Sequence, residues 1–138
     1  MLAGLSTLAC IASVNADVTP AQLFVDHMVI QRETQAPVWG SADAGESVKV
    51  TGSWGQSATT TADPGGKWSV KLQTPAAGGP HTISFEGHNR IELTNVLSGD
   101  VWLCSGQSNM QVPLRSTNNS AKNIADAEYP QIRTFTVA

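Results

Sequence analysis

Hydrophobic and polar residues alternate in short segments between residues 17 and 95, and turn-forming residues separate these segments. Trp68, Val70 and Leu72 alternate with polar residues, for example, which is the pattern of a strand with one buried face. Extended segments are expected at residues 23–25, 28–31, 36–40, 47–51, 59–61, 68–72, 83–85 and 91–93. Turn signals at such short, regular intervals favour an antiparallel β-sandwich over residues 17–95.

The pattern changes near residue 96. Val101 to Cys104 form a continuous apolar run, which is typical of a strand buried on both faces. Ser120 to Glu128 predict a helix with Ser120 as its N-cap, and Ile132 to Val137 predict a second strand. Strand, helix and strand together indicate the start of a parallel α/β domain at residues 96–138. Two strands and one helix cannot bury both faces of a parallel sheet, so we expect the chain to be part of a longer protein.

Residues 1–16 have the pattern of a signal peptide. Leu2 to Val14 are apolar or small, and Val14-Asn15-Ala16 fits a small-residue cleavage site. The run is too short to span a bilayer, so we expect a secreted or periplasmic protein without a membrane span. A buried first helix and a lipoprotein anchor at Cys10 are the alternatives. If residues 1–16 are removed, Cys104 is the remaining cysteine, and we expect a small core residue there.

The amino-acid composition and net charge limit the kinds of partner that the protein can be expected to bind. The chain has 138 residues, of which 41% are hydrophobic and 14% are charged, and this is enough for a globular core. The net charge is -3 at pH 7. Neither a basic surface for nucleic acid nor a Lys/Arg cluster for an anionic membrane is indicated.

Ser108 is the candidate catalytic residue. It follows the apolar run at 101–104, and Gly106 allows a sharp turn just before it. A serine at the carboxyl edge of a sheet lies where open α/β folds bind ligands, beside backbone N–H groups that can stabilise an oxyanion. Met110 stands where the Gly-x-Ser-x-Gly elbow has its last glycine. An ordinary turn is therefore the alternative interpretation.

The residues from Gly99 to Met110, GDVWLCSGQSNM, resemble the nucleophile block of the sialate O-acetylesterase family, a branch of the SGNH hydrolases. Further segments resemble the same family in the same order: LFVDHMVIQR at 23–32, PVWG at 37–40, TADPGGKW at 61–68 and GGPH at 78–81. The resemblance covers most of residues 21–138. It implies a jelly-roll-like β-sandwich accessory domain at 17–95, followed at 96–138 by the first part of a flavodoxin-like α/β hydrolase domain.

The resemblance also implies an activity. The protein would be an exported carbohydrate esterase that removes O-acetyl groups from sialic acid or another acetylated sugar, without a metal or organic cofactor. Ser108 would form the acyl-enzyme, and its backbone N–H would contribute to the oxyanion hole. Gly106, Gln107 and Asn109 would support this loop. The family's catalytic Asp-x-x-His is absent from this chain, so the histidine is expected in a longer protein.

Asp26 and His27 invite a second interpretation, a Ser–His–Asp triad with Ser108. Adjacent residues of a strand point to opposite faces, so we expect Asp26, His27 and Arg32 instead to tie the sandwich to the hydrolase domain. His81 and His88 have no Asp or Cys partner at metal-ligand spacing in the sequence.

The four tryptophans are candidates for sugar contacts. Trp54 is the one expected in a loop, where it could contact carbohydrate, whereas Trp39, Trp68 and Trp102 are expected in the core. The alternative to an esterase is a non-catalytic β-sandwich module that binds a glycan or a partner domain.

Overall fold

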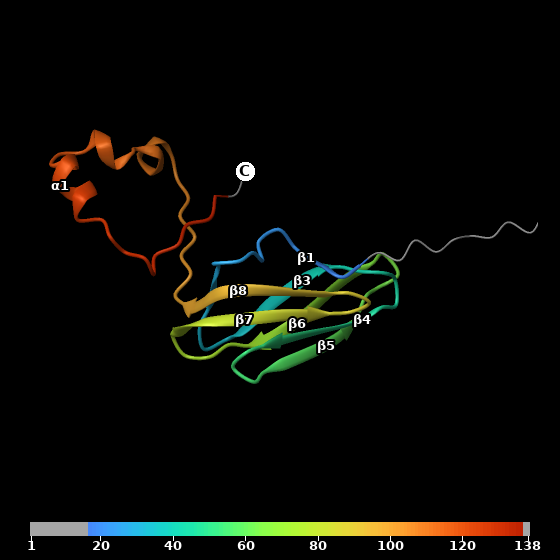
Figure 1. Ribbon diagram of the computed structural model, residues 1–138. Helices are drawn as coiled ribbons and strands as arrows, with labels where there is room; N and C mark the ends of the chain where they lie inside the picture. The colour runs from blue at the N-terminus through green and yellow to red at the C-terminus, as the bar shows by residue number, and fades with distance from the viewer. Residues whose placement is uncertain (1–16, 137–138) are drawn as a thin grey trace, which may run out of the picture.

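The computed structural model describes residues 17–136. The predicted signal peptide, with Cys10, lies outside the described residues, and so do residues 137 and 138. Within the described part, eight strands form two sheets (Figure 1). The strands are β1 (Thr19–Pro20), β2 (Val29–Gln31), β3 (Gln35–Ser41), β4 (Ser47–Gly52), β5 (Ser57–Thr61), β6 (Lys67–Gln73), β7 (Gly78–Glu86) and β8 (Arg90–Gly99).

The strand order is β1-β3-β6 in the three-stranded sheet and β2-β8-β7-β4-β5 in the five-stranded sheet. Neighbouring strands are antiparallel, except that the edge strand β2 runs parallel to β8. β8 continues past the predicted boundary at Asn95 and pairs with β2 up to Gly99. The last strand of the sheet therefore leads directly into the segment that carries Ser108.

Apolar side chains from the two sheets form one core between them. The ring centroids of Trp68 on β6 and Phe85 on β7 lie 6.0 Å apart. Burial alternates along β4 and β6, as the sequence pattern predicts for strands with one face in the core. The two-sheet β architecture is confirmed. The largest fully buried side chains are those of Phe85, Leu72, Ile83, Val18, Val38, Val48, Val50 and Val96.

The strand predicted at residues 23–25 is wrong. Leu23 lies in a turn that the Phe24 N–H closes by donating to the Ala21 carbonyl over 2.8 Å, and Phe24 and Val25 have no regular secondary structure. The buried Phe24 ring contacts Trp39 edge-on, with 4.9 Å between ring centroids. A single buried aromatic side chain holds this turn against the core, so three apolar residues in a row do not indicate a strand here.

Residues 100–136 contain a helix but neither of the two predicted strands. Val101 to Cys104 are exposed and pair with no described strand; Trp102 is 83% and Leu103 is 93% exposed. The described residues from Ile132 onward also form no strand, and Ile132 is 70% exposed. A strand needs partners for its backbone groups, and no described strand pairs with either segment.

The predicted helix forms in part. It is α1 (Ser120–Ala125), which follows two short 3₁₀ helices, η1 (Ser108–Gln111) and η2 (Leu114–Ser116). Ser120 is the first helical residue and not the N-cap, because Asn119 occupies the cap position with φ 57° and no side-chain capping bond. No described helix has the length and hydropathy of a bilayer span.

Candidate functional site

Ser108 lies at a turn outside the sandwich. It is the first residue of η1, it is exposed, and the Met110 N–H donates to the Gln107 carbonyl over 2.9 Å to close the turn. The N–H of a first helical residue has no partner within its helix. Among the described residues, no hydrogen bond or ion pair joins the Ser108 side chain to a histidine or carboxylate. The role of Ser108 as a nucleophile stays a prediction.

The residues around Ser108 contribute unequally to the turn. A Cβ atom at Gly106 would lie 2.7 Å from Cγ of Met110, so glycine makes room for the Met110 side chain. Gln107 and Asn109 are exposed, and their side chains have no hydrogen bonds within the described part of the chain. Backbone geometry and Gly106 therefore shape the turn. The amide groups of Gln107 and Asn109 take no part in it and can make other hydrogen bonds.

The beginning of the Ser108 segment is fixed to the sandwich. Arg32, directly after β2, donates from Nε to Oδ1 of Asp100 over 2.9 Å, and its backbone N–H donates to the Gly99 carbonyl over 3.0 Å. The Gln31 side chain accepts from the Val101 N–H over 2.9 Å. The hydrogen bond and charge of Asp100 raise the pKa of Arg32. Arg32 thus joins β2 to Gly99 and Asp100, which lie at the start of the predicted hydrolase domain at residues 96–138.

Asp26 and His27 contact β8 and not Ser108. Oδ1 of Asp26 accepts from the N–H and the hydroxyl of Thr94 over 2.6 and 3.0 Å. These two hydrogen bonds lower the pKa of Asp26, with the backbone bond as the larger cause. Nδ1 of His27 lies 2.7 Å from Nδ2 of Asn95. The two residues lie in a turn instead of a strand, so the structural reason they form no triad with Ser108 is their shared attachment to β8.

Arg133 is a functional candidate that the sequence patterns miss. Its Nη2 donates to Oδ1 of Asn95 over 2.9 Å. Its Nη1 donates to the Met28 carbonyl over 3.2 Å and also to the Asn95 carbonyl. The one available signal is that Arg133 is the lone charge in residues 129–136, because arginine enters apolar surroundings only with partners. Its partners are far away in the sequence and cannot be read from it.

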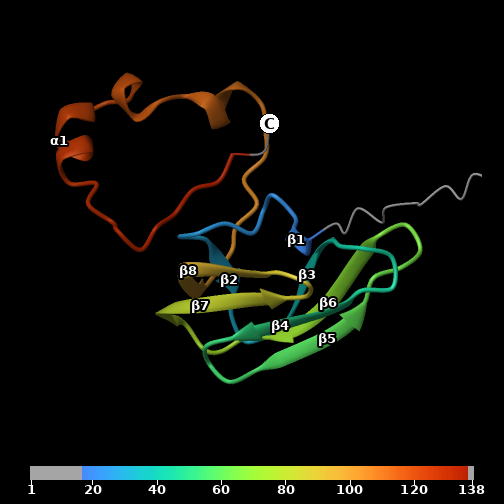
Figure 2. The same ribbon diagram turned by 45° about the vertical axis from the view of Figure 1, so that its right-hand side comes forward.

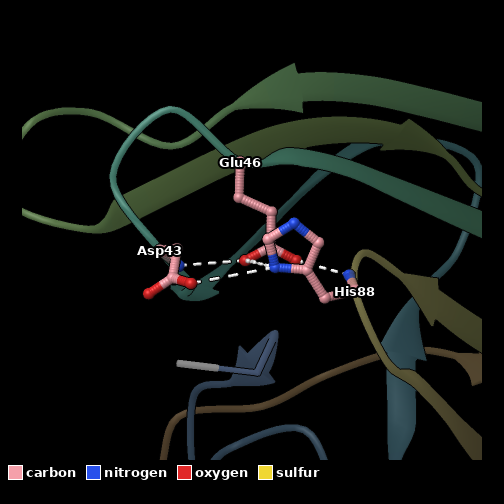
Figure 3. Close-up of side chains that lie close together, drawn as sticks. All are labelled: Asp43, Glu46 and His88. Atoms are coloured by element: carbon pink, nitrogen blue, oxygen red, sulfur yellow. Dashed lines mark hydrogen bonds and ion pairs between the residues drawn. The ribbon is translucent and has the colours of Figure 1, made fainter. Parts of the chain in front are cut away.

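Asp43, Glu46 and His88 lie together (Figure 3), in the loops that join β3 to β4 and β7 to β8. Nδ1 of His88 is 3.7 Å from Oδ2 of Asp43 and 3.6 Å from Oε2 of Glu46, and one ligand atom from each residue falls within 4.8 Å of the others. A divalent cation could contact all three. However, both Glu46 oxygens already accept backbone N–H groups, from Asp43 over 2.9 Å and from His88 over 2.6 Å. The buried carboxylate therefore joins two turns through these backbone hydrogen bonds.

The tryptophans are distributed differently from the sequence prediction. Trp68 is buried as expected, but Trp102 is exposed and Trp39 is partly exposed. Trp54 packs against the core, and its Nε1 donates to the Gln73 carbonyl over 2.8 Å. Its ring meets His81 edge-on, with 5.2 Å between centroids. Trp54 is therefore engaged within the sandwich, and Trp102 is the one that projects most into solvent.

Most of the chain aligns with one part of larger known proteins. No family model matches the chain. It is 38% identical over 127 residues to sialate O-acetylesterase of Rattus norvegicus and 34% identical over 123 residues to that of Homo sapiens. These alignments cover 82% and 80% of this chain, but 23% and 24% of the relatives.

A solved structure gives the same result. The crystal structure of a carbohydrate acetylesterase from Xanthomonas citri superposes with a TM-score of 0.75 at 36% identity, and the match covers 81% of this chain and 26% of that one. The chain thus spans about a quarter of the length of these relatives. Over about four fifths of its own length, it is homologous to part of the sialate O-acetylesterases and of a carbohydrate acetylesterase, as its sequence motifs predict.

Proposed function

We propose that this chain is part of an exported carbohydrate esterase that removes O-acetyl groups from sialic acid or another acetylated sugar. The observation that carries the proposal is homology over most of the chain to enzymes named for this activity. An alignment that covers 82% of 138 residues spans about 113 residues. Even if it began at Met1, it would include Ser108 and its surrounding block. The likeness therefore extends beyond the sandwich into the candidate site.

In the proposed reaction, Ser108 attacks the acetyl carbonyl. A histidine in a longer protein takes the hydroxyl proton and then passes it to the departing sugar oxygen. Water, deprotonated by the same histidine, next attacks the acyl-enzyme, which releases acetate and restores the serine. The backbone N–H of Ser108, which has no partner within η1, would stabilise the oxyanion.

We further propose that residues 100–136 begin a hydrolase domain whose other strands belong to the longer protein. The support is the set of large apolar side chains that this segment exposes: Val101, Trp102, Leu103, Met110, Val112, Leu114, Ile124, Tyr129, Ile132 and Phe135. Apolar surface on this scale indicates a contact with another protein layer. The predicted strands at 101–104 and 132–137 would then form when partner strands are present.

The second candidate function is a non-catalytic module that binds a glycan or a partner. The observation in its favour is that no described histidine or carboxylate contacts Ser108. The two functions predict different behaviour of a longer protein. Only the esterase requires a histidine that reaches Ser108.

Acetate release separates the two candidates. We expect a longer protein that contains this chain, together with the part homologous to the rest of its relatives, to release acetate from O-acetylated sialic acid or another O-acetylated sugar. We expect residues 1–138 alone to release none above background, because an unassisted serine hydroxyl is a weak nucleophile. An inactive longer protein would favour the binding module. Ser108-dependent release by the chain alone would contradict the proposed base.

Export gives a separate test. We propose that the protein is secreted or periplasmic and that cleavage after Ala16 leaves Asp17 as the mature N-terminus. The reason is the apolar run that ends in Val14-Asn15-Ala16. Expression in a bacterial host followed by intact mass measurement of the exported protein checks this result. Recovery of uncleaved protein from the cytosol alone would contradict it.

A further inference from the structure

The segment that carries Ser108 leaves the sandwich after β8 and returns to it (Figure 2). Its first residues contact the β2–β8 edge through Arg32 and Asp100. Its last part returns to the same pair of strands, where Arg133 contacts Asn95 on β8 and Met28 just before β2. Both ends of residues 100–133 are therefore attached to one edge of the five-stranded sheet.

Arg133 makes the attachment at the returning end. Its guanidinium donates to the Met28 carbonyl and to two oxygens of Asn95, one from the backbone and one from the side chain. Arg133 is partly buried, whereas the neighbouring Ile132 and Phe135 are exposed. Apolar packing does not hold this part of the chain, so the planar, multiply donating guanidinium provides the contact.

Asn95 is held in place for this contact. It adopts φ 53°, a left-handed conformation that asparagine tolerates better than most residues. Its amide nitrogen lies 2.7 Å from Nδ1 of His27, while its amide oxygen accepts from Arg133. One orientation of the amide thus serves both neighbours. His27 of the Asp26-His27 motif contacts Asn95, and Asn95 contacts Arg133. This indirect contact gives the motif a role that does not require contact with substrate.

We propose that Arg133 is a positioning residue for the esterase reaction. Together with Arg32, it fixes both ends of residues 100–133 to the sandwich, and the sandwich thereby sets the position of Ser108. This inference rests on the proposed function. The sandwich would then contribute to catalysis by holding Ser108 in position. The position matters because a displacement of about 1 Å in a reacting group can lower the rate about a hundredfold.

Trypsin tests the attachment in the 138-residue chain itself. Cleavage after Arg133 requires trypsin to take up the side chain that contacts Asn95 and Met28. Arg115 lies in the same segment and has no side-chain partner among the described residues. We expect the initial rate of cleavage after Arg133 to be at least about tenfold lower than after Arg115. Equal rates at the two arginines would overturn the proposal.

Substitution of Asn95 provides a matched pair. Asn95→Gly keeps the left-handed backbone but removes the side-chain oxygen, so we expect cleavage after Arg133 to accelerate about tenfold. Asn95→Asp keeps both oxygens that Arg133 contacts, and cleavage should stay slow. If the Gly and Asp variants were cleaved equally fast, the side-chain contact would not hold the segment.

Kinetics of the longer protein test the positioning role. We expect Arg133→Ala to lower kcat about tenfold to a hundredfold while KM changes less than about twofold, because the substrate pocket is kept and the nucleophile is misplaced. Arg115→Ala should match the unmodified protein. An unchanged kcat in Arg133→Ala would overturn the proposal. A longer protein without esterase activity would instead refute the proposed function, and the trypsin rates would still decide whether Arg133 attaches the segment.

Discussion

Ser108→Ala in a longer, active protein is expected to lower acetate turnover on the order of a millionfold, as loss of the nucleophile does in a serine protease with a catalytic triad. The substitution removes the oxygen that forms the acyl-enzyme, and no nearby side chain replaces it. Thermal stability should barely change, by no more than about 0.5 kcal/mol, because Ser108 is exposed and its side chain makes no hydrogen bond within the described residues. Acetate release and thermal unfolding, measured on one preparation, separate the two effects.

Ser116→Ala is the matched control for this experiment. Ser116 lies in the same exposed segment, at the end of η2, and is likewise a serine in a short 3₁₀ helix. Its variant should retain the turnover of the unmodified protein. If Ser108→Ala kept even about a tenth of that turnover, another residue would have to be the nucleophile.

The sandwich is predictable from sequence because its strands have one buried face. In β6, side-chain burial alternates residue by residue, and the hydrophobic pattern records this directly. The same rule fails at Leu23 to Val25, where one buried ring secures a turn, and at Val101 to Cys104. A continuous apolar run indicates that other parts of the protein must bury the segment. The segment becomes a strand only where a neighbouring strand supplies backbone hydrogen bonds.

The contacts around the candidate site are harder to predict. Asp26 and His27 stand out as residue types, but their partners Thr94 and Asn95 do not. Arg133 contacts Asn95 across 38 positions of sequence, and Glu46 contacts His88 across 42. No periodicity links residues at these separations, so the contacts depend on strand order. Ser108 is a candidate from the sequence because its local block is distinctive, whereas the contacts of Arg32 and Arg133 with its segment are found only once β2 and β8 are paired.

Glu46→Ala is expected to cause the second large effect, a loss of about 3 kcal/mol in the free energy of unfolding. The Glu46 side chain is 2% exposed, and its two oxygens accept the backbone N–H groups of Asp43 and His88. Removing it leaves two backbone donors without their acceptor, and each one costs about 1–3 kcal/mol where water cannot replace the lost oxygen. Urea unfolding of the 138-residue chain, followed by tryptophan fluorescence, measures the difference.

His88→Ala distinguishes the backbone contact from the imidazole contact. This substitution removes a half-exposed ring but keeps the His88 N–H that donates to Glu46. We expect it to cost less than about 1 kcal/mol, because the ring that is removed is half exposed to water. An equal loss in the two variants would mean that the ring, and not the backbone bond, joins the turns. Stability of the unmodified chain should also be insensitive to EDTA, because two backbone N–H groups already stabilise the buried carboxylate. A loss with EDTA as large as that of Glu46→Ala would show that a divalent cation bridges Asp43, Glu46 and His88.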